Sequence, residues 1–129
     1  MAVSARDKKT LLVLLEKAQL VYLLTRYPKK QVLDDPGDVE RLEQGLADMR
    51  AAARGLSAGL REAYGAVAWD ELAEKPDSTG LAWRRAKRVA PEVLRELGPL
   101  LRGEPEAAFL LQPEAPPKKA RSKTARRRT

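Results

Sequence analysis

A run of apolar residues at alternating spacings of three and four constrains this chain more than any other feature. Its members are Val39, Leu42, Leu46, Met49, Ala53 and Leu56. Because an α-helix completes a turn every ~3.6 residues, this spacing places all of these side chains on one helical face. Asp35 and Pro36 before the run are typical of an N-cap and of the first helical position. The segment therefore predicts an amphipathic helix that needs other helices to cover it.

The other segments also show helical patterns, and none shows the alternation typical of a strand. We expect helices over residues 6–26, 58–64 and 69–72, a long helix from about Leu81 to Leu100, and a short final helix within 104–111. Pro91 should kink the long helix or divide it at Ala90, because proline removes a backbone donor. Residues 29–34 should form a polar connection. The prediction is an all-α fold, an antiparallel bundle of four to five helices.

The first expected helix is apolar on two sides. One side carries Leu11, Leu14, Leu15, Ala18, Val21 and Tyr22, and the other carries Leu12, Val13, Leu20, Leu23 and Leu24. A helix of this kind has to be covered on more than one face. Either it lies at the centre of its own chain, or its second side meets a second copy in a homodimer. The interface of such a homodimer would contain Leu12, Leu20, Leu23 and Leu24.

Positive charge is concentrated at one end of the chain. The net charge is +7, yet residues 113–129 hold seven Lys/Arg and one Glu, which leaves eighteen Lys/Arg and seventeen Asp/Glu for residues 1–112. Apart from its prolines, the terminal segment has no apolar residue larger than alanine. It therefore cannot bury enough apolar surface to offset the entropy lost on ordering. We therefore expect one helical domain over 1–112 and a flexible, disordered basic tail over 113–129.

The composition also limits the chemistry. The chain has neither cysteine nor histidine, which excludes thiolate sites, histidine metal ligands and histidine general bases. We expect no cofactor, no metal and no catalytic residue of the usual kinds. The apolar run near Leu11 is too short to cross a bilayer, and the N-terminus is polar, so we expect a cytoplasmic protein that does not enter a membrane.

Several segments, taken in order, resemble the HepT-like family of the HEPN superfamily. The resemblance covers about residues 6–101. It is carried by the opening helix from Arg6, by residues 39–57, by Leu60-Arg61-Glu62-Ala63-Tyr64 followed by Val67-Ala68-Trp69-Asp70-Glu71-Leu72, and by Trp83 with Val89-Ala90-Pro91-Glu92-Val93-Leu94. The resemblance implies a HEPN-type helical bundle that dimerises.

The resemblance also implies a function. HepT-like proteins are ribonuclease toxins paired with a minimal nucleotidyltransferase antitoxin that modifies a tyrosine of the toxin. Their motif is an arginine, several residues, a histidine, one residue and a tyrosine, and it would fall between Leu72 and Trp83. Residues 73–82 contain no Arg, His or Tyr. The arginine would stabilise phosphate charge and the histidine would transfer the proton. Because both are missing, we expect that the chain cannot cleave RNA by the family's mechanism.

Two groups of basic residues are candidates for nucleic-acid binding, because Lys and Arg neutralise phosphates. The first is Arg84, Arg85, Lys87 and Arg88; the second is Lys118, Lys119, Arg121, Lys123, Arg126, Arg127 and Arg128. The first group suits a solvated helix face better than a phosphate site, whereas the tail is equally compatible with an extension that has no specific partner. Asp70, Glu71, Glu74 and Asp77 suit a helix start better than a metal site, and Trp69 and Trp83 suit the core better than base stacking.

Three functions remain open at this point. The leading hypothesis is a HepT-like protein that has lost ribonuclease activity and binds a nucleotidyltransferase partner, or RNA or DNA. The second is an active ribonuclease toxin with a non-standard site such as Arg84, Arg85 and Tyr64. The third is a stand-alone nucleic-acid-binding accessory protein.

Overall fold

Three long helices, α1 (Ala5–Leu24), α3 (Pro36–Gly55) and α6 (Thr79–Leu97), form most of the domain. The computed structural model describes residues 3–110. Between the long helices lie α2 (Lys29–Leu33), α4 (Ala58–Ala63) and α5 (Trp69–Ala73), and two 3-10 helices follow α6, η1 (Gly98–Leu101) and η2 (Pro105–Ala107). The described residues contain no strand. The all-α prediction is therefore confirmed, but the structure has six α-helices rather than four to five.

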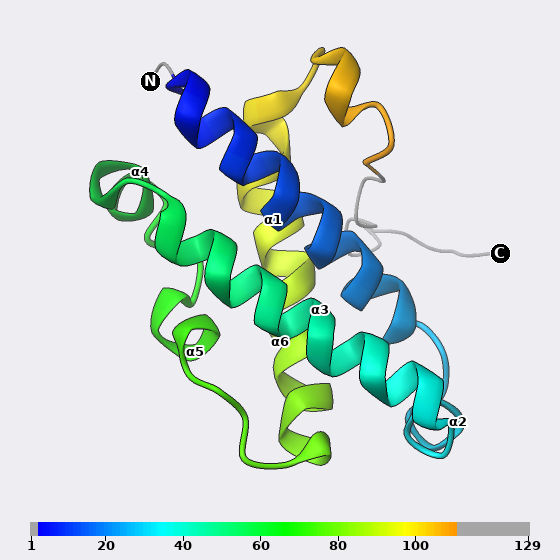
Figure 1. The fold of residues 1–129 in the computed structure, drawn as a ribbon. Helices are drawn as coiled ribbons and strands as arrows, with labels where there is room; N and C mark the ends of the chain where they lie inside the picture. Colours follow the sequence, from blue (N-terminus) through cyan, green and yellow to red (C-terminus); the bar gives the residue numbers. More distant parts are fainter. Residues whose placement is uncertain (1–2, 111–129) are drawn as a thin grey trace, which may run out of the picture.

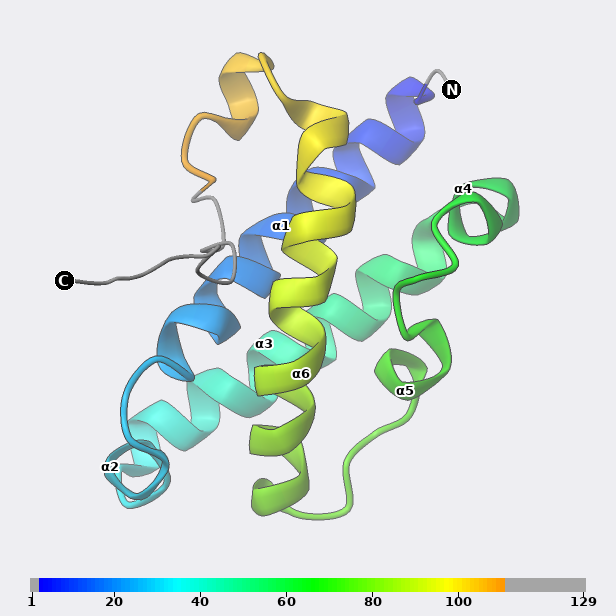
Figure 2. The same cartoon turned by 180° about the vertical axis from the view of Figure 1, so that it is seen from behind.

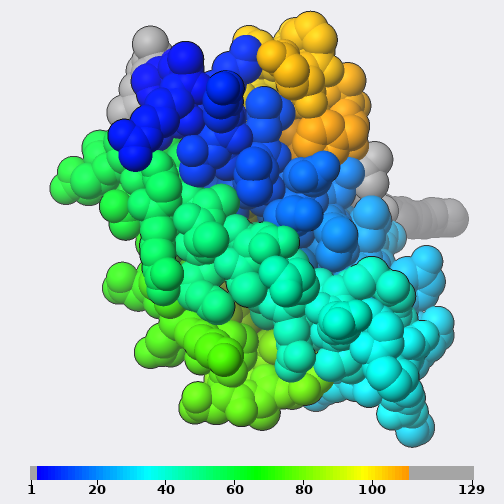
Figure 3. Space-filling view, in the orientation of Figure 1, coloured from blue at the N-terminus to red at the C-terminus, as the bar shows by residue number. Residues whose placement is uncertain are grey.

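α1 and α3 lie side by side and run in opposite directions, and α6 crosses behind both (Figures 1 and 2). The short helices α4 and α5 fill the space between the end of α3 and the start of α6. The space-filling view shows how closely α1 and α3 pack on the front face (Figure 3). The core therefore lies where the three long helices meet.

The close approach of α1 and α3 depends on Gly45. A Cβ atom at this position would stand 2.5 Å from Cγ2 of Val21, which no packed structure accommodates without a shift. A glycine inside a helix is normally unfavourable relative to alanine by ~1 kcal/mol. Here the closer packing between the two helices offsets that cost.

The two-sided character of α1 follows from its central position. Leu11, Leu14, Leu15, Ala18 and Val21 are completely buried. On the second side, Leu12, Leu20 and Leu24 are half-buried and pack against the same core, while Val13 and Leu23 stay exposed. The chain itself therefore covers much of the second side. A homodimer through Leu12, Leu20, Leu23 and Leu24 stays a prediction.

Residues 29–34 form helix α2 rather than the expected polar connection. The carbonyl of Pro28 accepts from the N–H of Val32 at 3.2 Å, and that of Lys30 from the N–H of Asp34 at 2.9 Å. Val32 is 1% exposed. Burial of this one side chain, next to a proline that suits a helix start, makes a turn of helix more favourable than an open loop.

α6 differs from the sequence prediction in two ways. Ser78 caps it, so it begins at Thr79 rather than near Leu81, and it continues through Pro91 to Leu97 without division. Proline leaves the carbonyl four residues earlier, that of Lys87, without its helical donor. Because Lys87 is exposed, water can solvate that carbonyl, and the helix tolerates the proline.

Side-chain hydrogen bonds hold the turn between α3 and α4 next to the start of α1. Asp7 is buried, and its carboxylate accepts from the N–H of Ser57 at 3.1 Å and from its hydroxyl at 2.8 Å. The Ser57 hydroxyl in turn caps α4 by accepting from the N–H of Leu60. The start of α1 is thereby tied to the turn between α3 and α4.

The segment after α6 folds back over α1. Lys8 forms ion pairs with Glu104 (2.5 Å) and Glu106 (3.5 Å), and Nε2 of Gln19 donates to the carbonyl of Phe109 at 3.0 Å. In place of the expected helix over 104–111, the described part of this segment has only the short η2. The proposed tail 113–129 lies outside the described residues. No helix in the described range is long and apolar enough to cross a membrane.

Candidate nucleic-acid interface

Four basic side chains line the outer face of α6. Arg84, Lys87, Arg88 and Arg95 are all exposed, and the helical period places them on one side of the helix, within about 100° of one another around the axis. We call these four residues the α6 stripe. The helix carries them outward because its opposite face, which includes Ala82, Ala86, Val89, Val93 and Leu97, is buried against α1 and α3. Arg84 and Arg95 are about 16 Å apart along the axis, at ~1.5 Å per residue.

Only one member of the α6 stripe forms an ion pair within residues 3–110. Arg88 contacts the carboxylate of Glu71 on α5, and the hydrogen bond with Glu71, together with its negative charge, raises the pKa of Arg88. Arg84, Lys87 and Arg95 have no carboxylate partner among the described residues. Glu92, four residues after Arg88, accepts from the N–H of Ala68 at 2.8 Å, and its negative charge also contributes to the raised pKa of Arg88. Glu96, next to Arg95 in sequence, is half-exposed and forms no ion pair with a described residue. The stripe therefore presents uncompensated positive charge.

Arg85 does not belong to this surface. It is 7% exposed, and its Nη1 donates to the backbone carbonyl of Glu74 while its Nη2 lies 3.6 Å from the Glu74 carboxylate. The sequence predicted Arg85 either as a phosphate contact or as part of a solvated helix face. Its buried position shows that both predictions are wrong for this residue. Its role is to hold the loop between α5 and α6.

Arg95 is the stripe residue that the sequence analysis missed. Because eleven residues are close to three full turns, Arg95 returns to the same side of α6 as Arg84. Continuing the helical period beyond residue 88 would have identified Arg95, whereas the cluster of basic residues at 84–88 does not include it.

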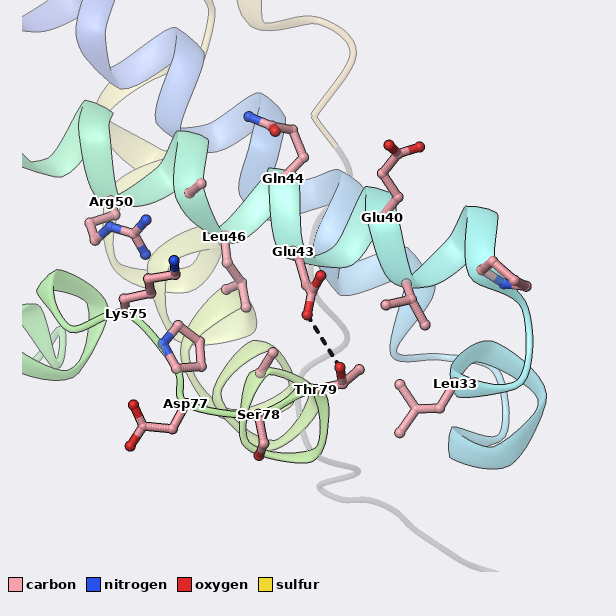
Figure 4. Close-up of a pocket in the computed structure, with 15 residues that line it drawn as sticks. Leu33, Glu40, Glu43, Gln44, Leu46, Arg50, Lys75, Asp77, Ser78 and Thr79 are labelled. Carbon is pink, nitrogen blue, oxygen red and sulfur yellow. Dashed lines mark hydrogen bonds between the residues drawn. The ribbon is translucent and has the colours of Figure 1, made fainter.

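Residues 73–82, where the resemblance places the ribonuclease motif, form the loop and helix start beneath α3. A groove with a cavity volume of about 960 Å³ separates this segment from α3. Figure 4 shows its lining side chains, including Glu43, whose carboxylate accepts from the Thr79 hydroxyl at 3.2 Å. We call this cavity the α3 groove.

The other candidate residues have structural positions. Trp83 is buried, which confirms a core position, and Trp69 is half-buried and donates from Nε1 to the carbonyls of Arg61 and Tyr64, both at 3.1 Å. Asp70 and Glu71 lie in the first turn of α5. Within residues 3–110, no three acidic side chains are grouped closely enough to hold a metal ion.

The structure does not assemble the non-standard catalytic set. Arg84 points outward, Arg85 is engaged with Glu74, and Tyr64 is half-buried at the end of α4. No hydrogen bond between described residues joins either arginine to the tyrosine. The basic tail candidates, Lys118, Lys119, Arg121, Lys123, Arg126, Arg127 and Arg128, lie outside the described residues.

No protein-family model, no curated protein and no solved structure matches this chain. The resemblance to the HepT-like family therefore stays a prediction from its motifs. Function has to be inferred from the arrangement of this chain's own side chains.

Proposed function

We propose that this protein is a nucleic-acid-binding helical protein of the HepT-like kind that lacks the family's ribonuclease motif. The observation that carries the proposal is the α6 stripe, in which three exposed cations have no carboxylate partner within the described residues. Such a surface attracts polyanions, because neutralising phosphates releases their condensed counterions.

The stripe is suited to phosphates rather than to isolated carboxylates. Arg84, Lys87, Arg88 and Arg95 follow one another along a single straight element, so an extended backbone can contact them in succession. None of them lies in an enclosed pocket that selects a base, which favours contacts to the backbone over sequence recognition. The seven basic residues of 113–129 add sequence-independent attraction.

Fluorescence anisotropy with a labelled single-stranded RNA tests the proposal. The triple variant Arg84→Gln, Lys87→Gln and Arg95→Gln should bind weakly. It should also reduce the slope of log K against log salt by about 2, at ~0.7 per phosphate contact. The matched control neutralises Lys9, Lys29 and Arg54, which are exposed elsewhere. An equal loss of RNA affinity in the two variants would show that only net charge matters, and would contradict the proposal that the α6 stripe is the binding site.

The HepT-like assignment adds a homodimer and a minimal nucleotidyltransferase partner to the proposal. Val13 and Leu23 of α1, 46% and 39% exposed, support a contact with a second copy. Light scattering after size-exclusion chromatography should give twice the chain mass, and Leu23→Glu should halve it. A monomer at all accessible concentrations would remove the dimer and leave the nucleic-acid proposal standing.

A ribonuclease assay separates binding from catalysis. Incubation with total RNA should leave it intact, because the chain has no histidine and the described residues bring no arginine pair and tyrosine together. Reproducible cleavage that disappears in Arg84→Gln would instead identify an active toxin with a non-standard site.

A further inference from the structure

The α3 groove is separate from the α6 stripe and has the size of a ligand site. Its volume of about 960 Å³ lies within the range of small-molecule pockets. One wall is α3; the other is the segment from Lys75 to Thr79 and the start of α6. In Figure 1 the loop between α5 and α6 runs below α3, whereas Figure 2 shows α6 from the opposite side.

Polar contacts hold the second wall in place. Arg85 donates to the carbonyl of Glu74 at the start of the loop. At its end, the Ser78 hydroxyl accepts from the N–H of Leu81 at 3.1 Å, and the Thr79 hydroxyl donates to Glu43 across the groove. These contacts restrict the loop that forms the second wall, which lowers the entropic cost of binding a ligand there.

Charges of opposite sign are separated along the groove. At one end the side chains of Arg50 and Lys75 project between α3 and the loop (Figure 4). Neither forms an ion pair with a described residue. Glu43 lies seven residues before Arg50 on the same side of α3, about 10 Å away along the axis. Asp77 lies two residues after Lys75 on the same wall but forms no ion pair with either cation among the described residues. The two cations therefore favour an anionic group at that end, where hydrogen bonds would be charge-assisted.

The surface between these charges is apolar. Leu46, Ala47 and Ala82 line it, and Pro76 contributes from the loop. A ligand that matches this order is negative at one end, apolar in the middle and positive at the other end. An extended peptide spans ~3.3 Å per residue, so about three residues cover the distance between Glu43 and Arg50.

We propose that the α3 groove binds a short peptide of about three residues with free ends. Its C-terminal carboxylate lies between Arg50 and Lys75, its ammonium group lies near Glu43, and its middle side chain packs on Leu46. Glu40, Glu43 and Asp77 also line the groove. These carboxylates disfavour a nucleic-acid backbone there, so the proposal does not depend on the stripe.

Titration of the full chain with Ala-Leu-Ala, followed by ¹H–¹⁵N NMR, tests the proposal. Amide signals of residues 43–50 and 75–82 should shift and saturate. Amidating the peptide's C-terminus or changing Arg50→Gln should each weaken binding about tenfold, the loss of one charge-assisted hydrogen bond. Arg54→Gln, on the same helix and outside the groove lining, is the matched control.

The combination of changes identifies the contact. If the carboxylate meets Arg50, the amidated peptide binds wild type and Arg50→Gln equally well. Lys75→Gln provides the same comparison should Arg50→Gln fold poorly by circular dichroism. Equal affinities of the free-acid and amidated peptides for wild type, or no saturable shifts up to ~10 mM peptide, would overturn the proposal.

Discussion

α3 and α6 both cover α1, yet their exposed sides are opposite in character. α3 carries four acidic and three basic residues, and α6 five basic and two acidic ones. On α3 several charges have neighbours of complementary polarity: Arg41 contacts Asp38, and Asp48 accepts from Gln44 at 2.9 Å and lies 3.7 Å from Lys17. On α6 the fully exposed charges are all basic, and of these four only Arg88 has a carboxylate partner among the described residues. The two acidic residues, Glu92 and Glu96, are half-exposed.

This contrast separates packing from function. Both helices meet the same requirement on their inner side, where Leu42, Leu46 and Met49 of α3 and Val89 and Val93 of α6 are buried. Burial does not prescribe the outer side, because exposed pairs contribute little to stability. The excess of exposed basic residues on α6 is therefore not a consequence of packing.

The largest expected effect lies at the inner side of α3. Gly45→Leu introduces atoms where even a Cβ would stand 2.5 Å from Val21, so α1 and α3 must separate. We expect a loss of about 3 kcal/mol in the free energy of unfolding, measured with urea. Ala51→Leu, on the exposed side of the same helix, is the control and should change little. Equal losses in both variants would contradict the proposed close contact.

The end of α3 should be the next most sensitive place. Asp7→Ala removes two hydrogen bonds to Ser57 and should lower the unfolding free energy by about 2 kcal/mol. Asp70→Ala, an exposed position in the first turn of α5, should cost clearly less. If both changes cost the same, Asp7 acts only as a local helix charge and not as a tie between α1 and α4.

Two neighbouring arginines divide the roles within α6. Arg85→Met removes a buried donor to Glu74 and should cost about 1 kcal/mol of stability without a change in RNA affinity. Arg84→Met should leave thermal unfolding unchanged and weaken RNA binding severalfold. The reverse outcome, measured by calorimetry and anisotropy, would place Arg85 rather than Arg84 at the interface.

Releasing Arg88 should strengthen the stripe slightly. Glu71→Gln removes its carboxylate partner, so one more cation becomes available to phosphates and RNA affinity should rise ~threefold at low salt. Thermal unfolding should hardly change, because the pair is exposed. The gain should vanish when Arg88→Gln is added; a gain that persists would point to general charge instead.

The smallest effect is a pH dependence of the fold-back segment. The pKa of Glu106 is lowered first by a hydrogen bond from the backbone N–H of Glu106 and second by the positive charge of Lys8. The pKa of Lys8 is raised, mainly by its hydrogen bond with Glu104. Stabilisation by Glu106 is present above its ordinary pKa and is lost as pH falls through the folded value. The stabilisation by Lys8 is present below the ordinary pKa of lysine and is lost as pH rises through the pKa of Lys8 in the folded protein.

Hydrogen exchange measures this window. The amides of Ala107 and Leu110, which donate to Glu104 and Ala107, should be best protected from mildly acidic to moderately alkaline pH, after correction for intrinsic exchange. Lys8→Gln should remove the loss of protection at alkaline pH and weaken the loss at acidic pH, because the backbone hydrogen bond of Glu106 remains. Unchanged protection at low pH in wild type would show that the ion pairs do not hold the segment.

Much of the fold was predictable from the sequence. The spacing of three and four over 39–56 identified α3. The stripe of Leu11, Leu14, Leu15, Ala18, Val21 and Tyr22 was also recognised, and the structure buries the first five of these residues and leaves Tyr22 half-buried. Asp35 was recognised as a cap because an aspartate side chain can satisfy backbone donors within a few residues, and in the structure it accepts from the N–H groups of Gly37 and Asp38. Signals of this kind are local, so a single sequence records them.

Only the tertiary structure decided what each exposed or buried position does. Helical period alone does not tell that Arg85 turns inward to the carbonyl of Glu74, that Lys87 faces water and so allows α6 to continue through Pro91, or that Gly45 meets Val21. Each depends on groups brought together from distant parts of the chain. The sequence by itself determined the three long helices and most of their apolar faces, because these patterns are local. The mutual packing of the helices decided which charges remain outside, and with them the α6 stripe and the α3 groove.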